Sequence, residues 1–96
     1  MKTLWLAAAL DDLDAIYEHI AADNPEAAGR VFGRIMEAVR DLSDRVHRGR
    51  PGRWPGTREL VIARTPYIAP YRVRADTIEI LRVFHGARRW PDKPSR

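Results

Sequence analysis

The sequence contains no cysteine, so disulfide frameworks and zinc sites with thiolate ligands are excluded. It also lacks a long apolar run: Met1–Leu10 leads directly into Asp11 and Asp12, without a signal-peptide cleavage pattern or a membrane-spanning length. The three histidines do not have the spacing of metal ligands. We therefore expect a cytoplasmic protein with no metal, no other cofactor and no association with a membrane.

Lysine is scarce as well. Of the 17 cationic residues, all but Lys2 and Lys93 are arginines. A guanidinium is a planar donor fork suited to carboxylates and phosphates, which points to an acidic protein partner or to nucleic acid. A GC-rich genome favours arginine codons and would produce the same excess, so both explanations stay open.

The charge is divided along the chain. Residues 1–44 hold four Lys or Arg against nine Asp or Glu, whereas residues 45–96 hold thirteen against four. Codon bias does not explain this asymmetry. The length of 96 residues and the ordinary apolar and charged fractions, 45% and 31%, predict one folded domain over residues 1–96.

Two amphipathic helices are predicted at about 8–22 and 25–45, because apolar residues recur there every three or four positions. The acidic residues of the first helix, Asp12 among them, are expected to face solvent. Asn24 is a favourable N-cap and Pro25 suits the first helical position. A tight Asn-Pro turn therefore joins the helices as an antiparallel hairpin.

Gly29 and Gly33 lie one turn apart in the second predicted helix. Each costs about 1 kcal/mol of helix propensity relative to alanine. Close approach of the first helix would compensate for this cost, so we expect the glycines at the contact between the helices.

Short apolar or alternating segments predict the strands 2–6, 59–64, 67–74 and 77–85, with a loop at 46–57. Ala75-Asp76 suits a two-residue hairpin turn, and Pro70 indicates an edge position or a bulge. The predicted order is β-α-α-β-β-β. We expect an α+β fold in which the helix hairpin packs on a mostly antiparallel sheet.

Four segments, taken in order, resemble the RelE/ParE superfamily of type II toxins: AADNPEAA, GRPGRWPGTREL, PYIAPYRV and IEILRVFHGARRW. The similarity covers about residues 4–90, and the order and spacing of the segments carry it more than any one motif. The resemblance implies a compact α+β toxin that is neutralised in a hetero-oligomer by a small antitoxin, whose C-terminal segment wraps over it.

The superfamily divides by target. RelE-type members cleave messenger RNA on the ribosome, whereas ParE-type members poison DNA gyrase without evident nuclease chemistry. The segment ILRVFH followed by GARR looks more like the ParE type. In addition, no tyrosine follows Tyr71, although RelE-type enzymes generally keep a Tyr or comparable group in the C-terminal segment. We therefore expect gyrase inhibition, with RelE-like cleavage of ribosome-bound mRNA as the alternative.

If the protein is a ribonuclease, the expected catalytic residues are Arg82, His85 and Arg88. Cleavage through a 2′-hydroxyl needs a proton-transfer group and cations on the phosphate. His85 is the best proton-transfer candidate, since imidazole changes charge near neutral pH. The alternative for His85 is a structural hydrogen bond to residues 86–87. His19 and His47 are expected to face solvent.

Arg82 interrupts an apolar strand, so it needs a partner if it is half-buried, and Glu59 or Glu79 is available. Alternatively, Arg82 lies on one face of the sheet with other arginines and meets phosphate or an acidic antitoxin. The arginines considered for that face are Arg58, Arg64 and Arg72.

The remaining candidates for contact with the target are Arg50, Arg53, Arg58, Arg89 and Trp90. They lie in a basic loop around Trp54 and in the tail, where arginines next to a tryptophan suit phosphate contact and base stacking. The alternative is that both tryptophans simply pack on the sheet. The tail is favoured over the loop because it follows the last strand closely. A third hypothesis is a family member that has lost toxicity and only binds its antitoxin or nucleic acid.

Overall fold

The computed structural model describes residues 1–93. Its elements are β1 (Lys2–Trp5), α1 (Ala7–Ala21), α2 (Pro25–Asp41), β2 (Arg50–Pro51), β3 (Arg58–Val61), β4 (Tyr67–Arg74), β5 (Thr77–Ile80) and β6 (Phe84–His85). The α+β architecture is confirmed. Three details of the strands differ from the expectation: the predicted loop contains the two-residue strand β2, the strand predicted at 59–64 ends at Val61, and the predicted last strand is divided into β5 and β6.

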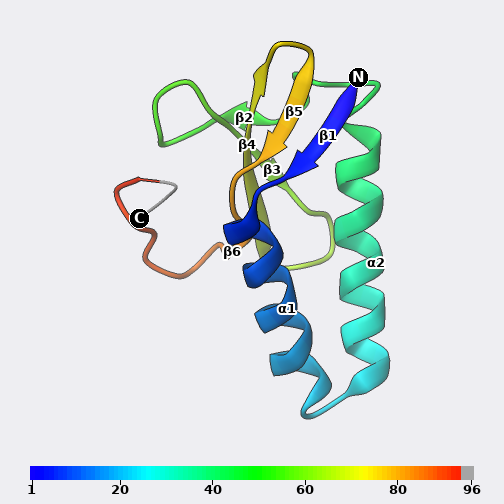
Figure 1. The fold of residues 1–96 in the computed structure, drawn as a ribbon. Helices are drawn as coiled ribbons and strands as arrows, with labels where there is room; N and C mark the ends of the chain where they lie inside the picture. Colours follow the sequence, from blue (N-terminus) through cyan, green and yellow to red (C-terminus); the bar gives the residue numbers. More distant parts are fainter. Residues whose placement is uncertain (94–96) are drawn as a thin grey trace.

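The strands form one sheet in the order β1-β5-β4-β3-β2, with β6 paired to β4. Among the strand pairings within residues 1–93, that of β1 with β5 is parallel and the others are antiparallel. The helix hairpin packs along one side of this sheet, while residues 86–93, which follow β6, lie on the side away from α2 (Figure 1). The mostly antiparallel sheet is therefore as expected.

The turn between the helices is formed by the predicted residues. The side chain of Asn24 accepts a hydrogen bond from the backbone N–H of Ala27 at 3.1 Å, and Pro25 is the first residue of α2. This cap satisfies one of the backbone donors that a helix start leaves without a partner. Helix α2 ends at Asp41, four residues before the predicted end.

The prediction for Gly29 and Gly33 is wrong. A Cβ atom added at either residue would meet no atom within 4 Å, and both residues are exposed. Gly33 lies on the outer side of α2, whereas Gly29 borders an open groove between the helices, and neither is at a close contact with α1. Their cost in helix propensity is therefore not offset by closer packing of the two helices.

Replacing Gly29 and Gly33 by alanine is accordingly expected to stabilise the protein by up to about 1 kcal/mol at each position. Thermal unfolding followed by circular dichroism measures the gain. Gly56 provides the control, because its φ of 73° disfavours a side chain and Gly56→Ala should destabilise the fold. An unchanged melting temperature in the double variant would contradict the conclusion that both glycines are exposed and that packing does not offset their cost in helix propensity.

The division of the last strand originates in a bulge opposite Pro70. The pairs Tyr71–Ile80 and Ile68–Phe84 leave two residues of β4 facing three residues of the other strand. Pro70 accepts a hydrogen bond from Leu81 at 2.9 Å but has no N–H to donate, so the regular ladder stops there. The extra residue redirects the segment around Arg82.

The predicted hairpin turn is present between β4 and β5. Ala75 and Asp76 both have positive φ, 48° and 61°, as a two-residue type I′ turn requires. The turn aligns Arg74 with Thr77 and thereby sets the register of the two central strands.

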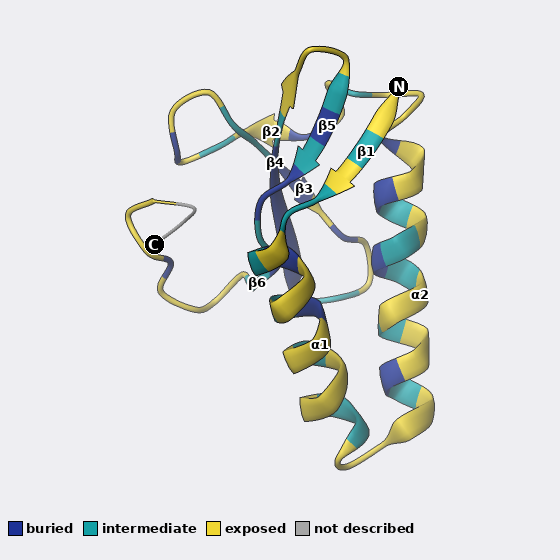
Figure 2. Cartoon of the chain, in the orientation of Figure 1, coloured by how far each residue is buried: buried dark blue, intermediate teal, exposed yellow. Residues whose placement is uncertain are grey.

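Two apolar clusters lie on opposite faces of the sheet. The larger cluster packs both helices against the sheet, and its most buried members are Ala9, Ile35, Leu42, Ala69, Tyr71, Ile78 and Ile80. The smaller cluster consists of Trp54, Ile68, Leu81 and Trp90, with Leu6 and Phe84 packed against it. Burial is concentrated in the central strands and on the inner side of α2 (Figure 2).

Candidate functional site

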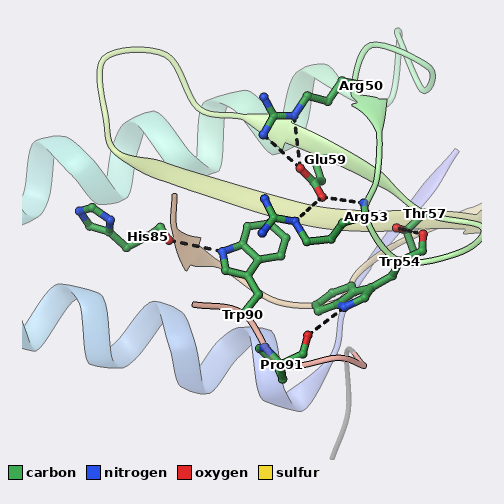
Figure 3. A network of polar contacts seen from close by, with 8 residues as sticks. All are labelled: Arg50, Arg53, Trp54, Thr57, Glu59, His85, Trp90 and Pro91. Carbon is green, nitrogen blue, oxygen red and sulfur yellow. Dashed lines mark hydrogen bonds and ion pairs between the residues drawn. The ribbon is translucent and has the colours of Figure 1, made fainter. Parts of the chain in front are cut away.

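The smaller cluster ties the C-terminal tail to the loop before β3. Trp54 is 4% exposed and Trp90 is 8% exposed, and their rings lie 5.6 Å apart. Trp54 Nε1 donates a hydrogen bond to the carbonyl of Pro91 at 3.0 Å, and Trp90 Nε1 donates to the carbonyl of His85 at 3.4 Å (Figure 3). Both tryptophans therefore serve a structural purpose, and the tail has a fixed course as far as Pro91.

Glu59 holds the loop beside this cluster. Its buried carboxylate accepts two hydrogen bonds from the guanidinium of Arg50, at 3.2 and 3.1 Å, on Oε1. Oε2 accepts from the backbone N–H and the Nε of Arg53, at 2.9 and 3.1 Å (Figure 3). Burial is the largest influence and alone would raise the pKa of Glu59, but the hydrogen bonds from Arg53 and Arg50 together outweigh it and hold the pKa below its ordinary value.

This lowered pKa has a consequence for stability at acid pH. The contribution of Glu59 is present above its ordinary pKa of 4.5 and is lost as the pH falls through the lowered folded value. We expect Glu59→Gln to be less stable than the wild type near neutral pH, with a free energy of unfolding that falls less steeply below about pH 5. Urea unfolding over a pH series measures this. The control is Glu37→Gln on exposed α2 surface, and an identical acid dependence in the wild type and Glu59→Gln would contradict the assignment.

Arg53 links Glu59 to the tail. Its guanidinium carbon lies 3.5 Å from the centroid of the Trp90 ring, which is a close cation–π arrangement. Around this contact is a shallow cleft of about 400 Å³, which we call the basic–aromatic face; it is lined by Arg53, Trp54, Arg88, Arg89, Trp90, Pro91 and Asp92.

The predicted contact residues differ in how far they are available on this face. Arg88 and Arg89 are exposed, and within residues 1–93 neither side chain has a hydrogen-bond or ion-pair partner. Arg53 is about half exposed, at 45%, and so is Arg50, at 53%, which does not line this face; Glu59 fixes both. Trp90 contributes its stacked ring and is otherwise buried.

Arg58 does not join this face, contrary to the expectation. It pairs across the sheet with Tyr71, which lies in the helix-side core, and its side chain points to that side. The guanidinium donates to the carbonyl of Gly49 at 2.7 Å and to that of His47 at 3.4 Å. Arg58 therefore closes the loop that follows α2.

Arg82 has a different partner from the two that were considered. Its Nε and Nη2 donate to the carboxylate of Asp12 on α1, at 2.7 and 2.9 Å, and the backbone N–H of Val83 donates to the same carboxylate at 2.9 Å. The hydrogen bonds to Asp12 raise the pKa of Arg82 above its ordinary value. The expectation that Asp12 only faces solvent is wrong, since it joins α1 to the segment between β5 and β6.

The arginines proposed to accompany Arg82 do not gather around it. Arg72 lies on the other face of the sheet and donates to Glu79 at 2.5 Å. This hydrogen bond is the main cause that lowers the pKa of Glu79. Arg64 is in the turn between β3 and β4, with a φ of 63°. Arg72 therefore does not share a face with Arg82, and Arg64 lies in a turn outside the strands.

His85 makes the local hydrogen bond that was considered as the structural alternative. Its Nδ1 accepts from the backbone N–H of Ala87 at 3.1 Å, and its ring packs edge-on against Tyr67 with centroids 5.7 Å apart. His85 nevertheless lines a second cleft together with Arg82 and Arg88. His19, predicted only to face solvent, lines this cleft too. The spacing of the histidines in the sequence did not indicate that His19 and His85 line the same cleft, because this depends on how α1 packs on the sheet.

In the part of the chain that the structure describes, no three histidine or acidic side chains are grouped in a way that could hold a metal ion. No helix among residues 1–93 is long and apolar enough to cross a membrane.

Comparison with known proteins shows which family has this fold and these motifs. The profile of the family described as "ParE toxin of type II toxin-antitoxin system, parDE" matches residues 4–90. A Sinorhizobium fredii protein named as a candidate toxin, Y4kP, is 49% identical over 87 residues, covering 91% of this chain and 90% of Y4kP. Toxin RelE2 of Caulobacter vibrioides is 36% identical over 87 residues, covering 91% and 97% respectively.

A solved structure gives the same result. A chain of the chromosomal ParDE system from P. aeruginosa superposes with a TM-score of 0.80 at 39% identity, covering 88% of this chain and 95% of that one. The family match spans nearly the whole described chain, from within β1 through the tail to Trp90. The chain therefore belongs to the ParE toxin family of type II toxin–antitoxin systems.

Proposed function

We propose that this toxin arrests growth by binding DNA gyrase through the basic–aromatic face, and that a cognate antitoxin prevents this. The observation that carries the proposal is the pair Arg88 and Arg89. Both are exposed, and neither has a side-chain partner within residues 1–93, whereas the tail around them is fixed by Trp54 and Trp90. Arginines held on a rigid support with no internal partner are typical of binding hot spots.

The antitoxin is expected to cover a different surface. Tyr17 and Phe32 are 41% and 40% exposed on the helix hairpin, where their rings pack edge-to-face with centroids 6.2 Å apart. They line a groove of about 480 Å³ together with Leu13 and Gly29. Exposed aromatic side chains beside a groove suit the apolar face of a partner helix. An antitoxin segment in this groove would lie on the helix side of the sheet, away from Trp90.

Induction of the toxin in cells, with two parallel readouts, tests the proposal. Gyrase poisoning predicts DNA breaks and an SOS response with messages intact. The alternative, RelE-like cleavage of ribosome-bound mRNA, predicts cut messages with DNA intact. Its catalytic residues would be His85, Arg82 and Arg88, which line one cleft. Cut messages without DNA breaks would overturn the gyrase proposal.

The double variant Arg88→Ala/Arg89→Ala is expected to lose most of its growth arrest while it still folds and binds antitoxin. The reason is that two exposed cations are removed from the tail and the helix groove is untouched. The matched control is Arg30→Ala/Arg40→Ala, which removes two exposed arginines from α2. Full growth arrest by the Arg88/Arg89 variant would place the active surface elsewhere.

A further inference from the structure

A cleft of about 440 Å³ lies between α1 and β6, and it shares only Arg88 with the basic–aromatic face. Its lining comes from α1, β4 and the chain from 82 to 88, which includes β6, and consists of Asp12, Ala15, Ile16, His19, Tyr67, Arg82, Val83, Phe84, His85 and Arg88. The volume falls in the range of about 300–1,000 Å³ that is typical of small-molecule sites. The cleft is thus large enough for more than a single anion.

The polar lining presents donors without partners. His85 accepts at Nδ1 from Ala87, so the neutral ring carries its proton on Nε2. Within residues 1–93, Nε2 has no hydrogen-bond partner, and the ring lies away from Trp90 (Figure 3). Arg88 also lacks a side-chain partner among these residues, and His19 is exposed at the last turn of α1. Three donors from two distant segments therefore border one space.

The single carboxylate in the lining does not oppose an anion. Asp12 is engaged by the guanidinium of Arg82 and by the N–H of Val83, so its charge is compensated within the wall of the cleft. The guanidinium of Arg88 and the two imidazoles remain. The electrostatics of the cleft hence favour a negatively charged ligand.

The other walls are apolar and partly aromatic. Ile16, Val83 and Phe84 border the cleft, and Tyr67 packs against the His85 ring. A small inorganic anion would leave these walls exposed to water, whereas a ligand that combines an anion with a flat ring would cover them. We propose that this cleft binds a nucleotide phosphate, with the phosphate near Arg88 and the histidines and the base against the apolar walls. The source is a free nucleotide or a strand of nucleic acid.

The proposal is tested by NMR titration of the whole ¹⁵N-labelled protein with adenosine monophosphate, inorganic phosphate, and five-residue adenine oligonucleotides of RNA and DNA. We expect adenosine monophosphate to shift the resonances of His19, His85 and Arg88, and to do so at lower concentration than phosphate. Arg88→Gln should weaken this binding about ten-fold, as expected for one charge-assisted contact. Arg30→Gln, on exposed α2 surface, is the matched control and should bind like the wild type.

The oligonucleotide arms distinguish the source. Tighter binding of an oligonucleotide than of the monophosphate indicates nucleic acid, and the reverse indicates a free nucleotide; both support the cleft. Shifts at Arg53, Trp54, Arg89 or Trp90 without shifts at His19 and His85, equal weakening by Arg30→Gln, or no shifts at millimolar ligand would overturn the proposal. This result does not depend on the gyrase assay, because it is read from binding to the isolated protein.

Discussion

Replacing Asp12 by asparagine is expected to lower the free energy of unfolding by about 3 kcal/mol, the low end for breaking a buried ion pair. The side chains of Asp12 and Arg82 are only 16% and 21% exposed, so the guanidinium would lose its counter-charge in a poorly hydrated place. Asparagine also replaces one of the two oxygens that accept from Arg82 by an NH2 group, which cannot accept, and leaves the other oxygen uncharged. Urea unfolding followed by circular dichroism measures the loss.

Asp14→Asn is the matched control, since Asp14 is exposed on the same helix and should change stability by less than about 0.5 kcal/mol. A second variant, Asp12→Leu/Arg82→Met, replaces the ion pair with apolar side chains and should recover part of the loss. Equal stabilities of Asp12→Asn and Asp14→Asn would show that the pair does not hold α1 to the sheet. The same contact implies that Arg82→Ala reduces growth arrest through loss of folding, without any contact to a target.

Replacing Trp90 by alanine is expected to destabilise the protein by about 3 kcal/mol, as for other large buried aromatic residues. The variant loses ring contacts with Phe84 and Trp54, at 4.9 and 5.6 Å between centroids, and the platform on which Arg53 stacks. The tail would then open more often. Trypsin should cleave after Arg88 and Arg89 more than about ten-fold faster, because proteolysis follows the population of the open form.

Trp90→Phe is the control for this experiment. It keeps an aromatic ring against Phe84 and Arg53, although a smaller one, and removes the long hydrogen bond to His85, which measures 3.4 Å. We expect a loss below about 1.5 kcal/mol and nearly unchanged cleavage. If Trp90→Ala is cleaved no faster than the wild type, this cluster does not hold the tail. The proposal that Arg88 and Arg89 lie on a rigid support would then be contradicted as well.

The local part of the fold could be predicted from the sequence. The helix hairpin follows from apolar spacing and from Asn24-Pro25, because helix periodicity and helix capping depend on residues that are close together in the sequence. The turn at Ala75-Asp76 and the irregularity at Pro70 are local in the same sense. The exposure of Gly29 and Gly33 was missed, because helical periodicity alone does not say how closely two helices approach.

The contacts of the site join residues that are far apart in the sequence, so they could not be predicted in the same way. Asp12 and Arg82 are separated by 70 residues, and they meet because the bulge opposite Pro70 redirects the chain toward α1. Glu59 had the pattern of an ordinary strand residue, yet it fixes two loop arginines. Composition located the positive charge in the second half of the chain, whereas the structure separates the paired arginines from Arg88 and Arg89.

The most direct test of gyrase inhibition is a DNA cleavage assay with purified gyrase, the toxin and supercoiled plasmid. We expect the wild-type toxin to cause gyrase-dependent accumulation of linear DNA. Arg88→Ala/Arg89→Ala should be weaker by about ten-fold or more, as expected for loss of two hot-spot arginines, while Arg30→Ala/Arg40→Ala acts like the wild type. No gyrase-dependent cleavage with the folded wild-type toxin, or full potency of the Arg88/Arg89 variant, would contradict it.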